Sequence, residues 1–154
     1  MKIFSILILL FSIPLIAQEK PDMEKEIAAI KTVIQAAYAD GIMNKGDIDS
    51  IEKGFHPGFA IIGMGNNSLW KYPIYNWIES VSKKKREGKF PPEKIVTFKY
   101  PLIDISGTAA IVRVEFFEGE NHKYTDFLSL YRFNEGWRIV SKIFFEHSEN
   151  KSAD

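Results

Sequence analysis

The chain has 154 residues, in which 20 Lys and Arg side chains balance 20 Asp and Glu side chains, and it contains no cysteine. This length suits one domain of ordinary size with a hydrophobic core. The balanced charge gives no electrostatic reason to expect a nucleic acid or an anionic membrane as a partner, and the lack of cysteine excludes disulfides and a lipid-anchored cysteine.

The first residues have the composition of a secretory signal peptide. Lys2 precedes an uncharged run from Ile3 to Ile16, which is interrupted by Pro14 and followed by a small residue. The run is shorter than the about 20 apolar residues that a membrane-spanning helix needs. We therefore expect cleavage after Ala17, export to the periplasm or the medium, and no membrane attachment of the mature chain. Residues 1–17 are then the signal peptide, and residues 18–154 form a single domain.

Three helices are predicted next. Apolar residues recur at helical spacing after Pro21 and predict an amphipathic helix that ends near Asn44-Lys45-Gly46. Asp47 is a suitable N-cap for a short second helix that Gly54 ends. The stretch at residues 55–64 reads as a loop and a first strand, and residues 72–88 predict the third helix. The apolar positions of the first helix are Ile27, Ile30, Val33, Ile34, Ala37, Tyr38 and Ile42.

The rest of the chain has the pattern of an antiparallel meander. Strands are predicted over residues 95–105, 109–117, 123–133 and 137–146, and Gly- and Asn-containing hairpin signals separate them. Helices followed by a run of antiparallel strands indicate the α+β class.

The order of these elements resembles the nuclear-transport-factor-2-like (NTF2-like) superfamily. The stretches AAYADGIMNKGDIDSIEKGFHPGFAIIG and YTDFLSLYRFNEGWRIVSKIFF carry the resemblance, which covers residues 24–147. Within the superfamily, the chain is most similar to the lumazine-binding, SnoaL-like branch. The resemblance implies N-terminal helices packed as a cone on a curved antiparallel sheet, a ligand pocket between them, and a second subunit against the outer sheet face.

Hairpin geometry then predicts which strand residues are neighbours. A three-residue loop after Phe133 places Ser129 opposite Ser141 and Tyr124 opposite Glu146, and the preceding hairpin places Arg113 opposite Asp126. Alternation puts a charged set of side chains on the sheet face away from the helices, with Asp126 diagonal to Lys142. We expect this face to form a homodimer interface; its members are Arg113, Glu115, Tyr124, Asp126, Lys142 and Glu146.

The same alternation puts two serines on the apolar face, under the helices. Buried hydroxyls need hydrogen-bond partners, so Ser129 and Ser141 either bond each other or form the polar floor of a pocket. In the second case the pocket would bind a small planar aromatic or apolar metabolite. Its expected residues are Tyr38, Trp70, Trp77, Phe127, Ser129, Tyr131 and Ser141.

The sequence offers little evidence for catalysis. Tyr38 is placed where ketosteroid isomerases of the resembling superfamily keep a catalytic tyrosine, but the positions of their two acids hold Gly63 and Ser129. An acid/base pair is therefore not evident, and the histidines lack metal-ligand spacing. No cofactor is implied. The main hypothesis is an exported small-ligand-binding or accessory domain; the alternatives are an isomerase, hydratase or cyclase using Tyr38 and His56, and a structural homodimeric partner.

Overall fold

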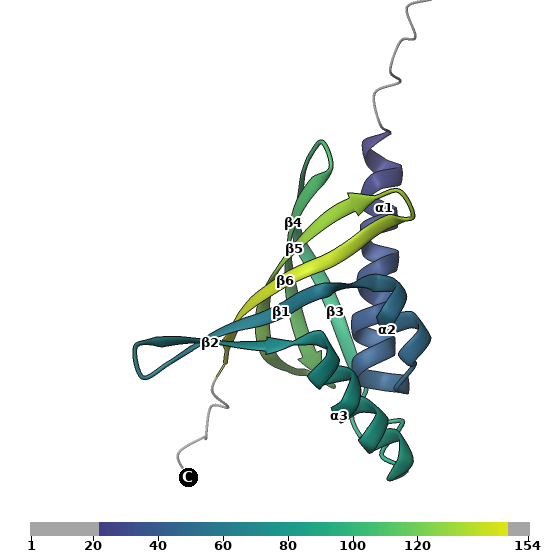
Figure 1. Ribbon diagram of the computed structural model, residues 1–154, viewed down its shortest axis with the longest axis vertical. Coiled ribbons are helices and arrows are strands. Elements are labelled where there is room, and N and C mark those ends of the chain that lie inside the picture. The colour runs from purple at the N-terminus through teal and green to yellow at the C-terminus, as the bar shows by residue number, and fades with distance from the viewer. Residues whose placement is uncertain (1–21, 148–154) are drawn as a thin grey trace, which may run out of the picture.

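A long N-terminal helix changes its hydrogen-bond pattern halfway along. In the computed structural model, which describes residues 22–147, α1 (Met23–Val33) continues directly into the π-helix η1 (Ile34–Lys45) (Figure 1). Gly46 ends η1 in the left-handed conformation, with φ 61°. The side chain of Asp47 then caps α2 (Ile48–Gly54) by accepting a hydrogen bond from the N–H of Ser50. The predicted helix ends are confirmed, whereas the predicted signal peptide lies outside the described residues.

The later elements also follow the predicted order, with one addition. β1 is Phe55–Gly65, α3 is Ile74–Arg86, and β3 to β6 are Val96–Ser106, Ala109–Glu118, Asn121–Phe133 and Gly136–Glu146. The sequence analysis missed β2 (Ser68–Pro73), which pairs with β1 through a tight turn. Asn66 and Asn67 both have positive φ in this turn, a conformation that Asn tolerates better than most residues.

The strands of the described residues form one six-stranded sheet in the order β2-β1-β6-β5-β4-β3. All neighbours are antiparallel except β1 and β6, which run parallel, so the sheet is mixed rather than purely antiparallel. The sheet curves and the helices lie along one side of it, as Figure 1 shows. The predicted α+β class with helices packed on a curved sheet is confirmed.

Two β-bulges change the predicted strand register. Ser129 pairs with Ser141 and Tyr124 with Glu146, as expected, but the hairpin loop is one residue shorter and Val140 is an extra residue in β6. Lys123 is an extra residue in β5, so Arg113 pairs with Phe127. The predicted pairing of Arg113 with Asp126 is therefore wrong, because a bulge displaces every later pair by one residue.

The bulges also exchange side chains between the two sheet faces. The inner face, toward the helices, includes buried Val112 and Val114, but also Tyr124, Asp126 and Lys142, which were expected on the outer face. The predicted placement of four ligand-binding candidates on the inner face is wrong. Six residues lie on the outer face with exposed or half-buried side chains, the four candidates Phe127, Ser129, Tyr131 and Ser141 together with Ile143 and Phe145.

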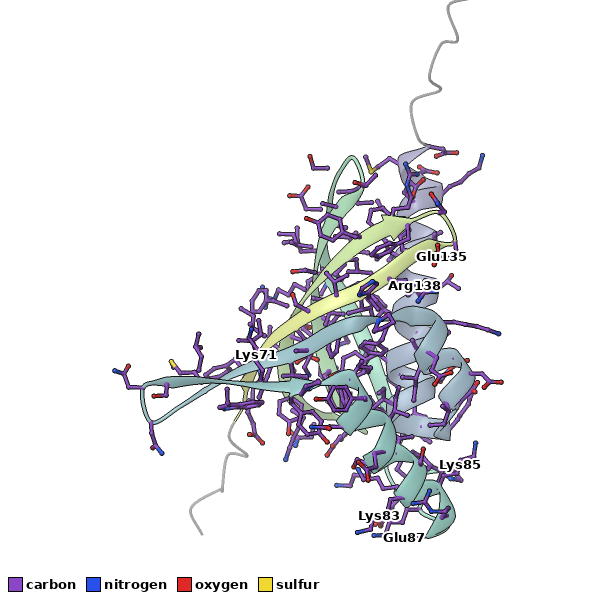
Figure 2. All side chains as sticks on the ribbon, in the orientation of Figure 1. Lys71, Lys83, Lys85, Glu87, Glu135 and Arg138 are labelled. Carbon is purple, nitrogen blue, oxygen red and sulfur yellow. The ribbon has the colours of Figure 1, made fainter. Side chains whose placement is uncertain are left out.

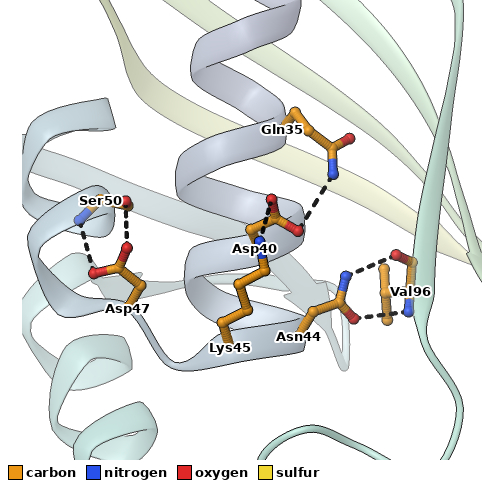
Figure 3. Close-up of polar contacts among 7 residues, drawn as sticks. All are labelled: Gln35, Asp40, Asn44, Lys45, Asp47, Ser50 and Val96. Carbon is orange, nitrogen blue, oxygen red and sulfur yellow. Dashed lines mark hydrogen bonds and ion pairs between the residues drawn. The ribbon is translucent and has the colours of Figure 1, made fainter.

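Polar side chains attach the helices to the sheet. Buried Asn44, at the end of η1, donates to the C=O of Val96 at 2.9 Å and accepts from its N–H at 2.8 Å (Figure 3). At the other end, Glu26 of α1 accepts hydrogen bonds from Arg132 and from Trp137 Nε1. These contacts fix both ends of the long helix over the inner face.

Most charged side chains lie at the periphery. Figure 2 shows Lys83, Lys85 and Glu87 at the far end of α3, and Glu135 with Arg138 at the β5–β6 hairpin. Cations in the last turn of a helix interact favourably with its dipole, which accounts for the basic end of α3. No helix in the part of the chain that the structure describes is both long and apolar enough to span a membrane.

Gly54 allows α2 to lie against η1. A Cβ atom at this position would lie 2.3 Å from the Cβ of Ala37, the residue that precedes Tyr38 in the chain. We expect Gly54→Ala to lower the free energy of unfolding by about 1–3 kcal/mol, because the two helices must separate. The control is Gly65→Ala, whose Cβ would meet no atom closer than 3.8 Å. Urea denaturation of both variants measures the difference, and equal stabilities would contradict this packing.

Candidate active site

A cavity of about 270 Å³ lies between η1, α3 and the inner sheet face. This volume is near the lower end of the range for small-molecule sites. The lining is mostly aromatic, with polar groups from Tyr38, Tyr72, Tyr124 and Lys142. The remaining lining residues are Met43, Ile61, Trp70, Trp77, Phe116 and Phe144.

Three titratable side chains meet beside this cavity. Lys142 Nζ donates to Tyr38 Oη at 2.6 Å and to Asp126 Oδ1 at 3.0 Å. Tyr38 Oη in turn donates to Asp126 Oδ2 at 2.7 Å. Tyr38 and Lys142 line the cavity, whereas Asp126 is not among the lining residues and lies behind them. Protons can therefore move between the carboxylate and two groups that face the cavity.

The network lies in the hydrophobic core. The exposed side-chain fractions of Lys142 and Asp126 are 7% and 0%, and Tyr38 is 1% exposed. Burial lowers the pKa of Lys142 below its ordinary value of 10.5, and the Asp126 carboxylate only partly opposes this effect. Burial, followed by the negative charge of Asp126, raises the pKa of Tyr38 well above 10.0. The hydroxyl thus stays protonated, while the amine loses its proton more easily than a lysine in water.

Aromatic rings surround the ammonium group as well. Lys142 Nζ lies 5.0 Å from the ring centroid of Tyr38, 5.1 Å from that of Phe144 and 5.6 Å from that of Trp77. Such cation–π contacts stabilise the charged form. Lys142 is therefore held in one place by the rings and the two hydrogen bonds, with its amine at the cavity wall.

The structure brings together only some of the residues that the sequence analysis selected as ligand-binding. Tyr38, Trp70 and Trp77 line the cavity as a group. Ser129 and Tyr131 line a separate shallow depression on the outer face instead, of about 290 Å³. The predicted serine floor is therefore not part of the cavity, because the Val140 bulge puts Ser141 on the outer face, and Ser129 of β5, which pairs with it, lies on the same face.

The histidines lie outside the cavity. His56 lies in β1, where its Nδ1 accepts a hydrogen bond from the N–H of Gly58 and its ring stacks on Phe133. It does not line the cavity with Tyr38, as the enzyme hypothesis required. On the outer face, His122 and His147 both approach Thr125 Oγ1, at 3.3 and 2.9 Å. The described residues contain no group of three His, Asp or Glu side chains positioned to hold a metal ion.

The π-helix helps to position Tyr38. A π-helix has wider turns than an α-helix and is often found at functional sites. Within η1, Ala37, Tyr38 and Ala39 are all buried in succession, and α2 covers the helix at Ala37 through Gly54. Asp126 and Lys142 were assigned to the wrong face, although their diagonal proximity was predicted correctly. A charged residue within an otherwise apolar strand was the available signal.

Comparison with solved structures gives the class of domain. NTF2-like proteins from Shewanella baltica and Methylobacillus flagellatus are both 28% identical to the chain, with TM-scores of 0.65 and 0.60. The matches cover 82% and 80% of this chain, and 97% and 94% of those proteins. An NTF2-like protein from Silicibacter pomeroyi, 21% identical, has a TM-score of 0.65 over 81% of this chain and 98% of its own. The fold is NTF2-like.

The family follows from the sequence match. The model of the family described as "Putative lumazine-binding" matches residues 25–145, and the chain belongs to this family. Among characterised proteins, the chain is also similar to the aldolase FrzH of a Cladobotryum species, with 29% identity over 117 residues. That match covers 75% of this chain and 89% of the aldolase.

The buried network should be costly to break at one point. We expect Lys142→Met to lower the free energy of unfolding by about 3–5 kcal/mol, because it leaves Asp126 buried without its cation. Replacing all three groups, as Tyr38→Phe, Asp126→Leu and Lys142→Met together, should restore wild-type stability or exceed it by about 1–4 kcal/mol. Urea denaturation at neutral pH compares the variants. If the triple variant had a lower free energy of unfolding than Lys142→Met, the network would instead stabilise the fold.

The pH dependence provides an internal control. The folded chain releases the Lys142 proton at a lower pH than the unfolded chain does, so the unfolded chain binds more protons in the interval below pH 10.5. The contribution of Lys142 to stability should therefore rise with pH through this interval, and the rise should be absent from the triple variant.

Proposed function

We propose that the cavity binds a small, mostly apolar carbonyl compound, and that Tyr38 and Lys142 act on its carbonyl group. The observation that carries this proposal is the buried network of Tyr38, Asp126 and Lys142 at the wall of an aromatic cavity. Titratable groups with shifted pKa values beside a cleft are typical of active sites. A buried ion pair gives a fold little net stability compared with apolar side chains of similar size, so stability alone accounts poorly for it.

The reaction class follows from what these groups can do. Lys142 has a third N–H group, which can donate a hydrogen bond to a carbonyl oxygen in the cavity and stabilise negative charge that develops there. This stabilisation makes a hydrogen on the neighbouring carbon more acidic. Asp126 can take up a proton through Tyr38, with which it shares a hydrogen bond. The set therefore suits enolisation of a carbonyl compound, the first half of an aldol reaction, and the similarity to an aldolase supports this reaction class.

Binding without turnover is the second candidate. The aromatic rings of Trp70, Trp77 and Phe144 favour a planar ligand, which can stack on them. The family description names lumazine, a planar heteroaromatic compound with carbonyl groups. In this case the network would recognise a carbonyl oxygen by hydrogen bonding and would transfer no proton.

Hydrogen exchange distinguishes the two candidates. With cyclohexanone as probe in heavy water, the wild type should accelerate replacement of the hydrogens next to the carbonyl by deuterium, as measured by NMR. Tyr38→Phe should reduce this acceleration by about 100-fold, because it removes the proton carrier. The exposed Tyr75→Phe is the matched control and should keep the wild-type rate. Saturable quenching of tryptophan fluorescence by cyclohexanone or lumazine without any exchange would leave the binding function only.

A homodimer through the outer sheet face is a further part of the proposal. The side chains of Ile111, Phe127, Ile143 and Phe145 are 46–62% exposed on this face, and such apolar patches often mark interfaces. A second copy is favoured as the partner because Arg113 and the nearby Glu115 carry opposite charges, so a two-fold axis can place each opposite the other. The interface thus differs from the predicted charged one, since Asp126 and Lys142 face inward.

The dimer is tested by its mass in solution. We expect Ile143→Lys to convert a dimer into a folded monomer, because the new charge would be buried at the interface. Met64→Lys is the control, since Met64 is 77% exposed on the β1–β2 hairpin, away from this patch. Light scattering measures both variants, and a monomeric wild type at micromolar concentration would refute the interface.

Export of the chain also remains a proposal, supported by the uncharged run after Lys2. Expression of the full sequence in a bacterium should yield exported protein whose N-terminal residue is Gln18. Mass spectrometry of the purified material determines the N-terminus. Detection of the intact N-terminus at Met1 would contradict a cleaved signal peptide.

A further inference from the structure

We propose that Lys142 is a covalent catalyst that forms a Schiff base with an aldehyde or ketone in the cavity. This inference rests on the proposed function and assigns the reactive atom, Lys142 Nζ, within the same site. It also defines the substrate class more narrowly. The carbonyl group must belong to an aldehyde or a ketone, because esters and amides do not give an imine.

Geometry is the first argument. The lysine enters the cavity wall from β6, and its amine is fixed by hydrogen bonds to Tyr38 Oη and Asp126 Oδ1 at 2.6 and 3.0 Å. These bonds use two of the three N–H groups of an ammonium. Since the lysine lines the cavity while Asp126 lies behind it, the amine stands between the proton acceptor and the space for the ligand.

The proton balance is the second argument. Asp126 accepts a proton from the Lys142 ammonium, and the free electron pair of the nitrogen then forms a bond to the carbonyl carbon. The carbonyl oxygen takes a proton from Tyr38, which is replenished from Asp126. Loss of this hydroxyl group as water, with the second amine proton transferred to it through the same groups, leaves a protonated imine. An ammonium and a carbonyl compound thus become an iminium and one water, and the charge of the site is unchanged.

Desolvation is the third argument. A lysine in an apolar pocket is a better nucleophile at neutral pH than one in water, because its neutral form is more abundant. The lowered pKa of Lys142 agrees with this requirement.

The resulting iminium draws electrons from the neighbouring carbon more strongly than the carbonyl does, so removal of a proton gives an enamine. An enamine can attack a second aldehyde to form a carbon–carbon bond, and hydrolysis by one water then releases the product and the amine.

Reductive trapping tests the proposal. The wild-type protein is incubated at neutral pH with cyclohexanone and sodium cyanoborohydride, which delivers hydride to the C=N bond and leaves a stable secondary amine. Peptide mass spectrometry then locates the added cyclohexyl group. We expect Lys142 to be modified about tenfold faster than the exposed Lys83 of α3 in the same sample. Cyclohexanol, which has no carbonyl group, is the matched control and should give no adduct.

Two variants separate reaction from folding. Tyr38→Phe keeps the aromatic ring but removes the hydroxyl, so it should slow adduct formation at Lys142 and leave that at Lys83 unchanged. The triple variant Tyr38→Phe, Asp126→Leu and Lys142→Met should lose the cavity adduct while circular dichroism shows a folded domain.

The outcomes distinguish this inference from the proposed function. Saturable quenching of tryptophan fluorescence by cyclohexanone without an adduct at Lys142 would overturn the Schiff base and leave the carbonyl site in place. Modification of Lys142 no faster than that of Lys83 would overturn it equally. Neither quenching nor an adduct would refute both proposals.

Discussion

The buried contact between Asp126 and Lys142 depends on one extra residue in each of two strands. Val140 interrupts the regular pairing of β6 with β5, and Lys123 interrupts that of β5 with β4. Side chains alternate between the two faces of a strand, so the bulge at Val140 turns Lys142 from the outer face to the inner one. Without that residue, Ser141 and Ile143 would face the helices and the site would have no amine.

The helices then determine which side chains surround Asp126 and Lys142 on the inner face. Asn44 and Glu26 attach the two ends of the long helix to β3 and to the β5–β6 region. Between these attachments, η1 presents Tyr38 to Asp126, and α3 contributes Trp77 to the cavity. Because the close approach of α2 at Gly54 supports the same part of η1, the position of one hydroxyl group depends on contacts from several elements.

The sequence predicted the elements well and the site poorly, for a specific reason. Helix caps such as Asp47 and turn residues such as Gly46 act locally, and the structure confirms them. A bulge leaves no comparable mark in a sequence. The predicted loop after Phe133 was one residue too long, and this error compensated for the unseen bulge, so the Ser129–Ser141 pair was correct while the face was wrong. Tyr38 and Trp77 were identified because aromatic residues near a helical face do not depend on strand register.

Each sheet face departs at a few positions from the usual pattern of polarity, and these departures unite the proposals. A sheet that packs helices on one side normally buries apolar residues and exposes polar ones. Here the inner face contains an ion pair, while the outer face exposes Phe127, Ile143 and Phe145. Each departure is unfavourable for an isolated domain in water, since one removes charge from solvent and the other leaves apolar surface in it. A carbonyl ligand would use the buried ion pair, and a second subunit would cover the exposed apolar side chains of the outer face. The bulge at Val140 contributes to both departures, because turning Lys142 inward also turns Ile143 outward.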